Sequence, residues 1–154
     1  NKKFVKLILN KNEEILWSSR SMIPSDYKGN IISFEPLSNA YDQLSRNSRR
    51  YNKWTIHPKN ALGNFEGNID INVSKNSLSS SILEITKQHL EARNDSVNVG
   101  KEKVMITKLD SIFKMYYKKN KRFFLKMDCQ GYEQKILDGA QQSLENILGA
   151  IVAC

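Results

Sequence analysis

Short apolar strands that alternate with helical segments constrain the fold of this chain more than any other feature. The runs 31–34 and 123–127 are short and apolar, and each ends in an acid, at Glu35 and at Asp128. Residues with helical spacing follow both strands, with Ser38 placed as a helix N-cap after the first. Strands that alternate with helices predict an α/β fold with a mostly parallel sheet flanked by helices.

Other segments complete this pattern. Further strands are expected at 54–57, 67–73 and 150–153, short β signals at 97–99 and 104–106 around Gly100, and helices at 109–117 and 132–140. Alternating apolar and polar residues in 67–73 predict a half-buried strand, as in antiparallel or edge positions. The opening run 4–9 fits a buried strand or the front of a helix, and 4–20 also fits an amphipathic helix.

Composition fits one globular domain over residues 1–154. Of its residues 40% are apolar and 26% are charged, and no internal repeat is visible. Cys129 and Cys154 cannot build a disulfide framework, so a reducing cytoplasm is the expected location. No apolar stretch has the length of a transmembrane segment, and the first residues lack the features of a signal peptide.

Basic residues outnumber acids, which raises the question of a polyanionic partner. The formal net charge is +8, and the basic residues gather in two clusters between a helix and the next strand: Arg46, Arg49, Arg50 and Lys53, then Lys118, Lys119, Lys121 and Arg122. Cations near helix C-termini complement the helix dipole, so solvated helix ends are favoured over a nucleic-acid site. His57 and His89 are isolated, and the interpretation favoured for Cys129 is inert packing.

Two acids at strand ends are the first candidates for chemistry. In α/β sheets, ligands bind beyond the carboxyl ends of the strands, where the strand order reverses. Glu35 is placed to accept the hydroxyls of a ribose, or it is an ordinary polar strand end. Asp128 and Glu133 flank a turn with Gly131 and bring two carboxylates to one rim, although Glu133 also suits a helix N-terminus.

Taken together, several motifs resemble the FkbM family of S-adenosylmethionine-dependent methyltransferases. The most specific are "SFEP" at 33–36 and the K-x-D-x-Q-G-Y-E pattern at 126–133. Supporting motifs follow in the same order: Ala61-Leu62-Gly63-Asn64 with Gly67, Asn76 with Ser79-Ser80-Ser81, Leu109-Asp110-Ser111, and Leu137-Asp138-Gly139-Ala140. The resemblance implies a class I, Rossmann-like methyltransferase fold that acts on a hydroxyl of a sugar, lipid or secondary metabolite.

The resemblance also implies roles for individual residues. Glu35 would bind the ribose of S-adenosylmethionine, with Pro36 and Leu37 shaping the pocket floor. The adenine would lie at Ala61, Leu62 and Asn64, and Ser80 would touch the donor. Asp128 would lie near the methionine amine, the methyl group or the acceptor oxygen, and Asp128 and Glu133 form the expected reaction centre. A carboxylate or a histidine would take the acceptor proton while the enzyme aligns the reactants.

The sequence departs from the family before the strand 31–34. There the family carries an Asp-x-Gly-Ala-Asn-x-Gly loop, whose glycines let the backbone approach the donor. Here the corresponding stretch is 7–14, and no glycine precedes Gly29. Either the loop lies outside this chain, or the protein is a degenerate relative that does not bind the donor. We therefore expect one domain that is incomplete at one or both ends, with 1–28 as a divergent or leading segment and the C-terminal strands missing.

A second hypothesis for the function of this chain is of another class than an enzyme. It is a non-catalytic α/β module whose basic clusters contact RNA or another polyanion. The missing glycines favour this module, whereas the retained acids Glu35, Asp128 and Glu133 favour the methyltransferase. The partner expected for the enzyme is a small molecule, glycan or lipid that carries a hydroxyl, with no specific nucleic acid and no metal.

Overall fold

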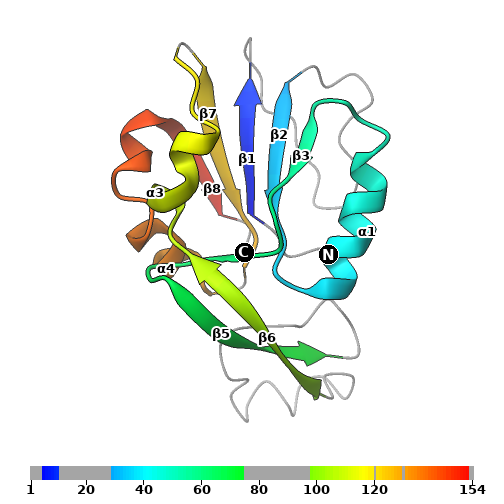
Figure 1. Cartoon of the computed structure of the whole chain (residues 1–154). Coiled ribbons are helices and arrows are strands. Elements are labelled where there is room, and N and C mark those ends of the chain that lie inside the picture. The colour runs from blue at the N-terminus through cyan, green and yellow to red at the C-terminus, as the bar shows by residue number, and fades with distance from the viewer. Residues whose placement is uncertain (1–4, 11–28, 75–97, 120, 130, 153–154) are drawn as a thin grey trace.

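A five-stranded sheet dominates the fold (Figure 1). The computed structural model describes residues 5–10, 29–74, 98–119, 121–129 and 131–152. The strand order of this sheet is β3-β2-β1-β7-β8. Its strands are β1 (Val5–Asn10), β2 (Asn30–Phe34), β3 (Trp54–Ile56), β7 (Arg122–Met127) and β8 (Ile147–Val152).

Four of these five strands run in the same direction. The pairs β2–β3 and β7–β8 are parallel, whereas β1 lies antiparallel to both β2 and β7. The predicted parallel direction is therefore confirmed for four strands and wrong for the central one. A helix over 4–20 is wrong for Val5–Asn10, because pairing with two neighbouring strands decides the state of a short apolar run; residues 11–20 lie outside the described residues.

The strand order places the ends of β2 and β7 at one edge of the sheet. Numbered along the chain, the strands lie in the order 3-2-1-4-5, which is the strand order of doubly wound α/β folds, but here the central strand β1 runs in the opposite direction. Val5 at the start of β1 pairs with Phe34, and Lys6 pairs with Lys126. The first residues of β1 therefore lie between the carboxyl ends of β2 and β7, at the edge where such folds bind ligands.

A second, three-stranded sheet corrects the prediction of a single sheet. Its order is β4-β6-β5, with β4 (Ala61–Leu62) parallel and β5 (Gly67–Ser74) antiparallel to β6 (Asn98–Thr107). The two short β signals predicted around Gly100 belong to this one long strand. Gly100 pairs with Val73, so cross-strand pairing outweighs the low strand propensity of glycine. The half-buried character predicted for β5 is confirmed, since Ile71 is buried and Asp70 is exposed.

One apolar core joins the two sheets. Ile71, Val104 and Ile106 of the small sheet pack in the same cluster as Phe34 and Met127 of the large sheet. Burying each of these side chains contributes about 1.5–3 kcal/mol to folding. In Figure 1 the β5–β6 pair crosses below the large sheet, at the end where β2 and β7 finish. The small sheet therefore borders the edge that carries the strand-end acids.

The helices of the described ranges are short, and carboxylates hold the amino ends of three of them. They are α1 (Ser38–Ser48), α3 (Leu109–Ile112), α4 (Glu133–Asp138) and the 3₁₀ turns η1 (Phe113–Met115) and η2 (Ser143–Asn146). Glu66 accepts hydrogen bonds from the Lys108 N–H and the Ser111 hydroxyl at the start of α3. Asp110 accepts the Ser143 N–H at 2.7 Å at the start of η2. Such bonds satisfy the N–H groups that a helix leaves free at its amino end.

Element boundaries differ from the prediction in three places. The helix predicted at 109–117 is one turn of α3 followed by η1. Strand β8 begins at Ile147 rather than at residue 150, because it pairs with β7 from Phe123 onward. The helix predicted at 132–140 ends earlier, at Asp138, with Gly139 as its C-cap. None of the helices in the described ranges has the length and hydropathy of a bilayer-crossing segment.

Gly139 fixes the approach of α4 to the small sheet, and substitution should show this. A Cβ at residue 139 would lie 1.8 Å from the Gly63 carbonyl oxygen, so Gly139→Ala forces two backbones apart. We expect a loss of about 1–3 kcal/mol in the free energy of unfolding, measured by urea denaturation. Gly100→Ala is the matched control, because a Cβ there meets nothing within 4 Å. Equal stability of the two variants would contradict the close approach.

Candidate functional site

Glu35 lies at the carboxyl end of β2 and is almost fully buried. Only 2% of its surface is exposed, and its Oε1 accepts the Leu37 N–H at 3.0 Å. Pro36 between them cannot extend the strand, and the chain turns here into α1. Leu37 is partly buried against the core. The turn over residues 35–37 therefore fixes the direction of the Glu35 carboxylate.

Asp128 begins a tight turn at the carboxyl end of β7. The Cys129 N–H and the Gly131 N–H donate to the Glu133 carboxylate, at 3.0 Å and 2.8 Å. Gly131 has a φ of 98°, a left-handed conformation that glycine adopts without strain. Glu133 thus closes the turn from the first residue of α4. Asp128 is half-buried, and none of the hydrogen bonds found among the described residues involves its carboxylate.

The thiol of Cys129 is under the electrostatic influence of both strand ends. Burial raises the pKa of its thiol to about 12, and the negative charges of Glu133, Asp128 and Glu35 add to this rise. Glu35 acts on this thiol from β2, across the position of β1. The three predicted carboxylates therefore share one neighbourhood. A thiol with so high a pKa is a poor nucleophile, in agreement with the packing role favoured for Cys129.

The segment 60–64 borders the same turn from the small sheet. Ala61 and Leu62 form β4, and both side chains are buried in the core. Gly63 packs against the Tyr132 ring, since a Cβ at residue 63 would lie 3.3 Å from it. Asn64, next in the chain, is half-buried. The backbone and the Asn64 amide are therefore the polar groups of this turn, while Ser80 lies outside the described residues.

Asn60 is a residue that the sequence did not single out. Its Oδ1 is buried and lacks a hydrogen-bond partner among the described residues. An unsatisfied buried acceptor costs about 1–3 kcal/mol, so it calls for an explanation. Asn60 directly precedes β4 and follows Lys59. A donor group of a ligand at this edge would satisfy it.

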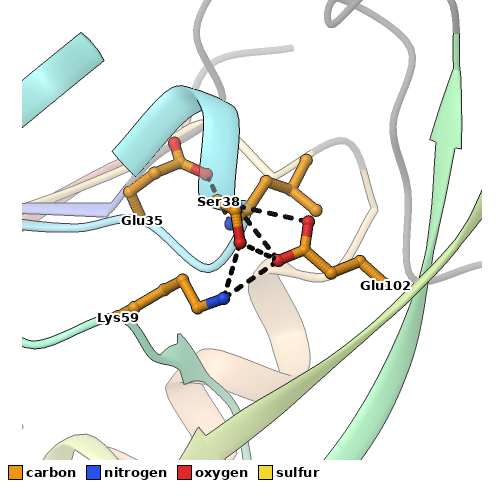
Figure 2. Close-up of polar contacts among 5 residues, drawn as sticks. Glu35, Ser38, Lys59 and Glu102 are labelled. Carbon is orange, nitrogen blue, oxygen red and sulfur yellow. Dashed lines mark hydrogen bonds and ion pairs between the residues drawn. The ribbon is translucent and has the colours of Figure 1, made fainter. Parts of the chain in front are cut away.

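Glu102 is a second residue that the sequence did not single out, and it links the small sheet to α1 (Figure 2). Its carboxylate accepts the Ser38 N–H at 3.1 Å and the Ser38 hydroxyl, and it pairs with the Lys59 Nζ at 3.0 Å. Burial alone would raise the pKa of Glu102, but the hydrogen bonds from Ser38 and Lys59 outweigh it and lower that pKa. The predicted N-cap role of Ser38 is wrong: the N-cap is Leu37, and Glu102 from β6 accepts the N–H instead.

His57 is a core residue rather than a ligand. It is 5% exposed, its Nδ1 is hydrogen-bonded to the Tyr116 hydroxyl, and its ring lies 4.9 Å from that of Phe34. Burial lowers the pKa of His57, which favours the neutral form. The described residues contain no group of three or more histidine, cysteine or acidic side chains that could hold a metal ion. His89 lies outside the described residues.

Both basic clusters lie at the opposite edge of the large sheet. Arg46 is in the last turn of α1, and β3 begins just after Lys53. The second cluster follows η1 and leads into β7 at Arg122. Because β3 and β7 run parallel, both clusters mark their amino ends. The strand-end acids and the basic clusters are therefore separated by the length of the strands.

Comparison with known proteins gives one match. The family model described as the Methyltransferase FkbM domain matches residues 10–152. No curated protein and no solved structure matches the chain. The matched region includes β2, the 35–37 turn, the 128–133 turn and all of β8.

The contact of Glu102 with α1 predicts a pH-dependent contribution to stability. In the folded protein the pKa of Glu102 lies below its ordinary value of 4.5. The contribution of the charged Glu102 to the free energy of unfolding is therefore present at pH values above 4.5, and it is lost as the pH falls through the folded-state pKa. We expect Glu102→Gln to lower the free energy of unfolding by about 1 kcal/mol at neutral pH, and by less in acid. Urea denaturation over a pH series measures this.

Asp42→Asn is the matched control, because Asp42 is exposed on α1 and loses the same charge. Its stability should follow that of the wild type at every pH. The contradicting result is a difference in the free energy of unfolding between Glu102→Gln and the wild type that stays constant as the pH is lowered. In that case the charge of Glu102 is not what stabilises α1.

Proposed function

The chain belongs to the FkbM methyltransferase family, and we propose that it transfers the methyl group of S-adenosylmethionine to a hydroxyl oxygen. The acceptor would be a sugar, a lipid or a secondary metabolite. The observation that supports this best is the strand pairing, which places Glu35 after β2 and Asp128 after β7 at the same edge, on either side of the first residues of β1. It puts carboxylates on both sides of the central strand, at the edge where doubly wound folds bind nucleotides.

Glu35 is proposed to bind the ribose of the donor. A carboxylate has about four lone-pair sites, so the same Glu35 side chain can accept the Leu37 N–H, which orients it, and bind ribose hydroxyls. Bonds from hydroxyls to a carboxylate are charge-assisted and short, which favours a diol over a single hydroxyl. Since Glu35 is 2% exposed, donor binding has to displace the groups that cover it.

The adenine is proposed to lie against the 60–64 segment. The orphaned Asn60 Oδ1 is an acceptor, and the amino group of adenine is a donor that suits it. The Asn64 amide supplies a further polar contact. Pro36 and Leu37 would form the pocket floor, and the Ala61 and Leu62 side chains would support it from the core. Ser80 keeps its proposed contact with the donor.

Asp128 and Glu133 are proposed to serve the reaction in different ways. Both carboxylate oxygens of Glu133 accept hydrogen bonds from N–H groups of the turn. Glu133 therefore holds the turn that begins at Asp128 and so positions Asp128. Asp128 then takes the acceptor proton. His57 is not assigned this role, because it is buried and its Nδ1 is hydrogen-bonded to the Tyr116 hydroxyl. The acceptor oxygen forms a bond to the methyl carbon as the carbon–sulfur bond breaks. The electron pair of that bond stays on sulfur and yields S-adenosylhomocysteine.

Most of the rate enhancement in this proposal comes from alignment. In-line displacement needs the acceptor oxygen behind the methyl group, and a bound pair of reactants gains from proximity and orientation. A carboxylate that removes the proton adds about 10²–10⁴-fold. The fixed turns at Glu35 and Asp128 suit this requirement, because each is held by hydrogen bonds to backbone N–H groups.

Binding of S-adenosylhomocysteine to the full-length protein tests the proposal without knowledge of the acceptor. Glu35→Gln keeps the shape of the side chain and removes its charge. We expect its affinity, measured by titration calorimetry, to fall about tenfold or more, since charge-assisted hydrogen bonds are worth about 1.5–3 kcal/mol each. Asp42→Asn loses the same charge on α1 and should bind as the wild type does. Equal affinities for all three proteins, or no binding by the wild type, would overturn the assignment.

A further inference from the structure

The amino edge of the large sheet combines positive charge with exposed apolar side chains. Between Ser111 and Met127 the sequence holds no acid. The cations of this stretch at the edge are Lys114, Lys118, Lys119, Lys121 and Arg122, and all are exposed except the half-buried Lys121. The cluster at the end of α1 adds four more. In Figure 1 the end of α1 and the loop before β7 lie at the same end of the sheet.

Two apolar side chains stand among these cations. Met115 is 67% exposed and Tyr117 is 43% exposed. The Tyr117 ring stacks on Phe123, with ring centroids 6.0 Å apart and an angle of 18° between the planes. One face of the Tyr117 ring is therefore covered by Phe123, whereas most of the Met115 side chain is exposed to solvent. Solvated cations at helix ends would explain the basic residues of this edge. They do not explain why Met115 and Tyr117 are exposed beside them.

We infer that the amino edge docks on an anionic membrane surface. Polybasic segments are attracted to anionic lipid headgroups, and apolar side chains beside them enter the interface. Tyrosine is enriched at membrane interfaces, where its ring and its hydroxyl both find suitable surroundings. Charge complementarity supports this occupant, since nine cations, the two basic clusters and Lys114, lie at this edge, and the sequence holds no acid between Ser111 and Met127.

A nucleic acid fits the same charge less well. Single strands bind by stacking bases on aromatic faces along a basic groove. The covered face of Tyr117 reduces its value as a stacking surface, and Met115 offers no hydrogen bond to a base. The exposed thioether chain suits the acyl boundary of a bilayer better than a phosphate backbone.

Docking by this edge orients the protein. Strand β7 has six residues and spans about 20 Å at about 3.3 Å per residue. The edge that carries Glu35 and Asp128 then faces the aqueous phase, about that distance from the lipid. The candidate site remains open to an acceptor that approaches from water or extends from the headgroup layer.

Vesicle co-sedimentation of the full-length protein tests the docking. The probes are vesicles of phosphatidylcholine alone and vesicles with about 30 mol% phosphatidylserine, at a salt concentration near 0.15 M. We expect binding to the anionic vesicles and at least about tenfold weaker binding to the neutral ones. The triple variant Lys114→Gln, Lys118→Gln, Lys119→Gln should lose about a hundredfold in affinity, because each cation contributes about fivefold.

Two further variants separate docking from general attraction. Lys101→Gln, Lys103→Gln, Lys135→Gln removes the same charge from exposed positions on β6 and α4, and it should retain its affinity. Met115→Ser should lose about fivefold on anionic vesicles and nothing on single-stranded polyuridine. If both triple variants lose equally, or if Met115→Ser binds vesicles as the wild type does, the surface is a general polyanion site and the inference is wrong. Unchanged melting temperatures confirm that each variant is folded.

Discussion

Carboxylates from distant parts of the chain cap α1, α3 and η2, and these contacts tie the layers of the fold together. No N-cap side chain of α1, α3 or η2 makes a capping hydrogen bond. Glu102, Glu66 and Asp110 supply the acceptors from 64, 42 and 33 residues away. Each bond satisfies an N–H group at the amino end of a helix or 3₁₀ turn, and each carboxylate complements the positive end of the dipole. Each therefore joins two elements as well as capping one.

The same chemistry organises the candidate site. Glu102 holds Ser38 at the start of α1, directly after the turn in which Glu35 accepts the Leu37 N–H. Glu133 holds the turn that begins at Asp128. The Glu35 carboxylate is thus fixed by an N–H of the following turn, and Asp128 begins a turn whose N–H groups are held by Glu133. Because β1 lies between the two strands, the turns face one another at the edge where strand order reverses.

Much of the fold could be predicted from local pattern, and the rest depends on long-range pairing. The apolar runs at β2 and β7, their terminal acids and the helices after them are visible in the sequence. The direction of β1 and the continuity of β6 through Gly100 were not, because a neighbouring strand decides both. The short motifs indicated Glu35 and Asp128. Glu102 and Asn60 were missed, since a cap from 64 residues away and an orphaned acceptor leave no local signal.

Hydrogen–deuterium exchange with and without S-adenosylhomocysteine tests most directly the claim that the donor binds between these two turns. The predicted result is slower exchange at Leu37 and Ser38, at Gly63 and Asn64, and at the amides from Gly131 to Glu133. The segment 114–122 at the opposite edge should exchange at an unchanged rate. Protection confined to that segment, or no protection at a saturating concentration of ligand, would contradict the claim.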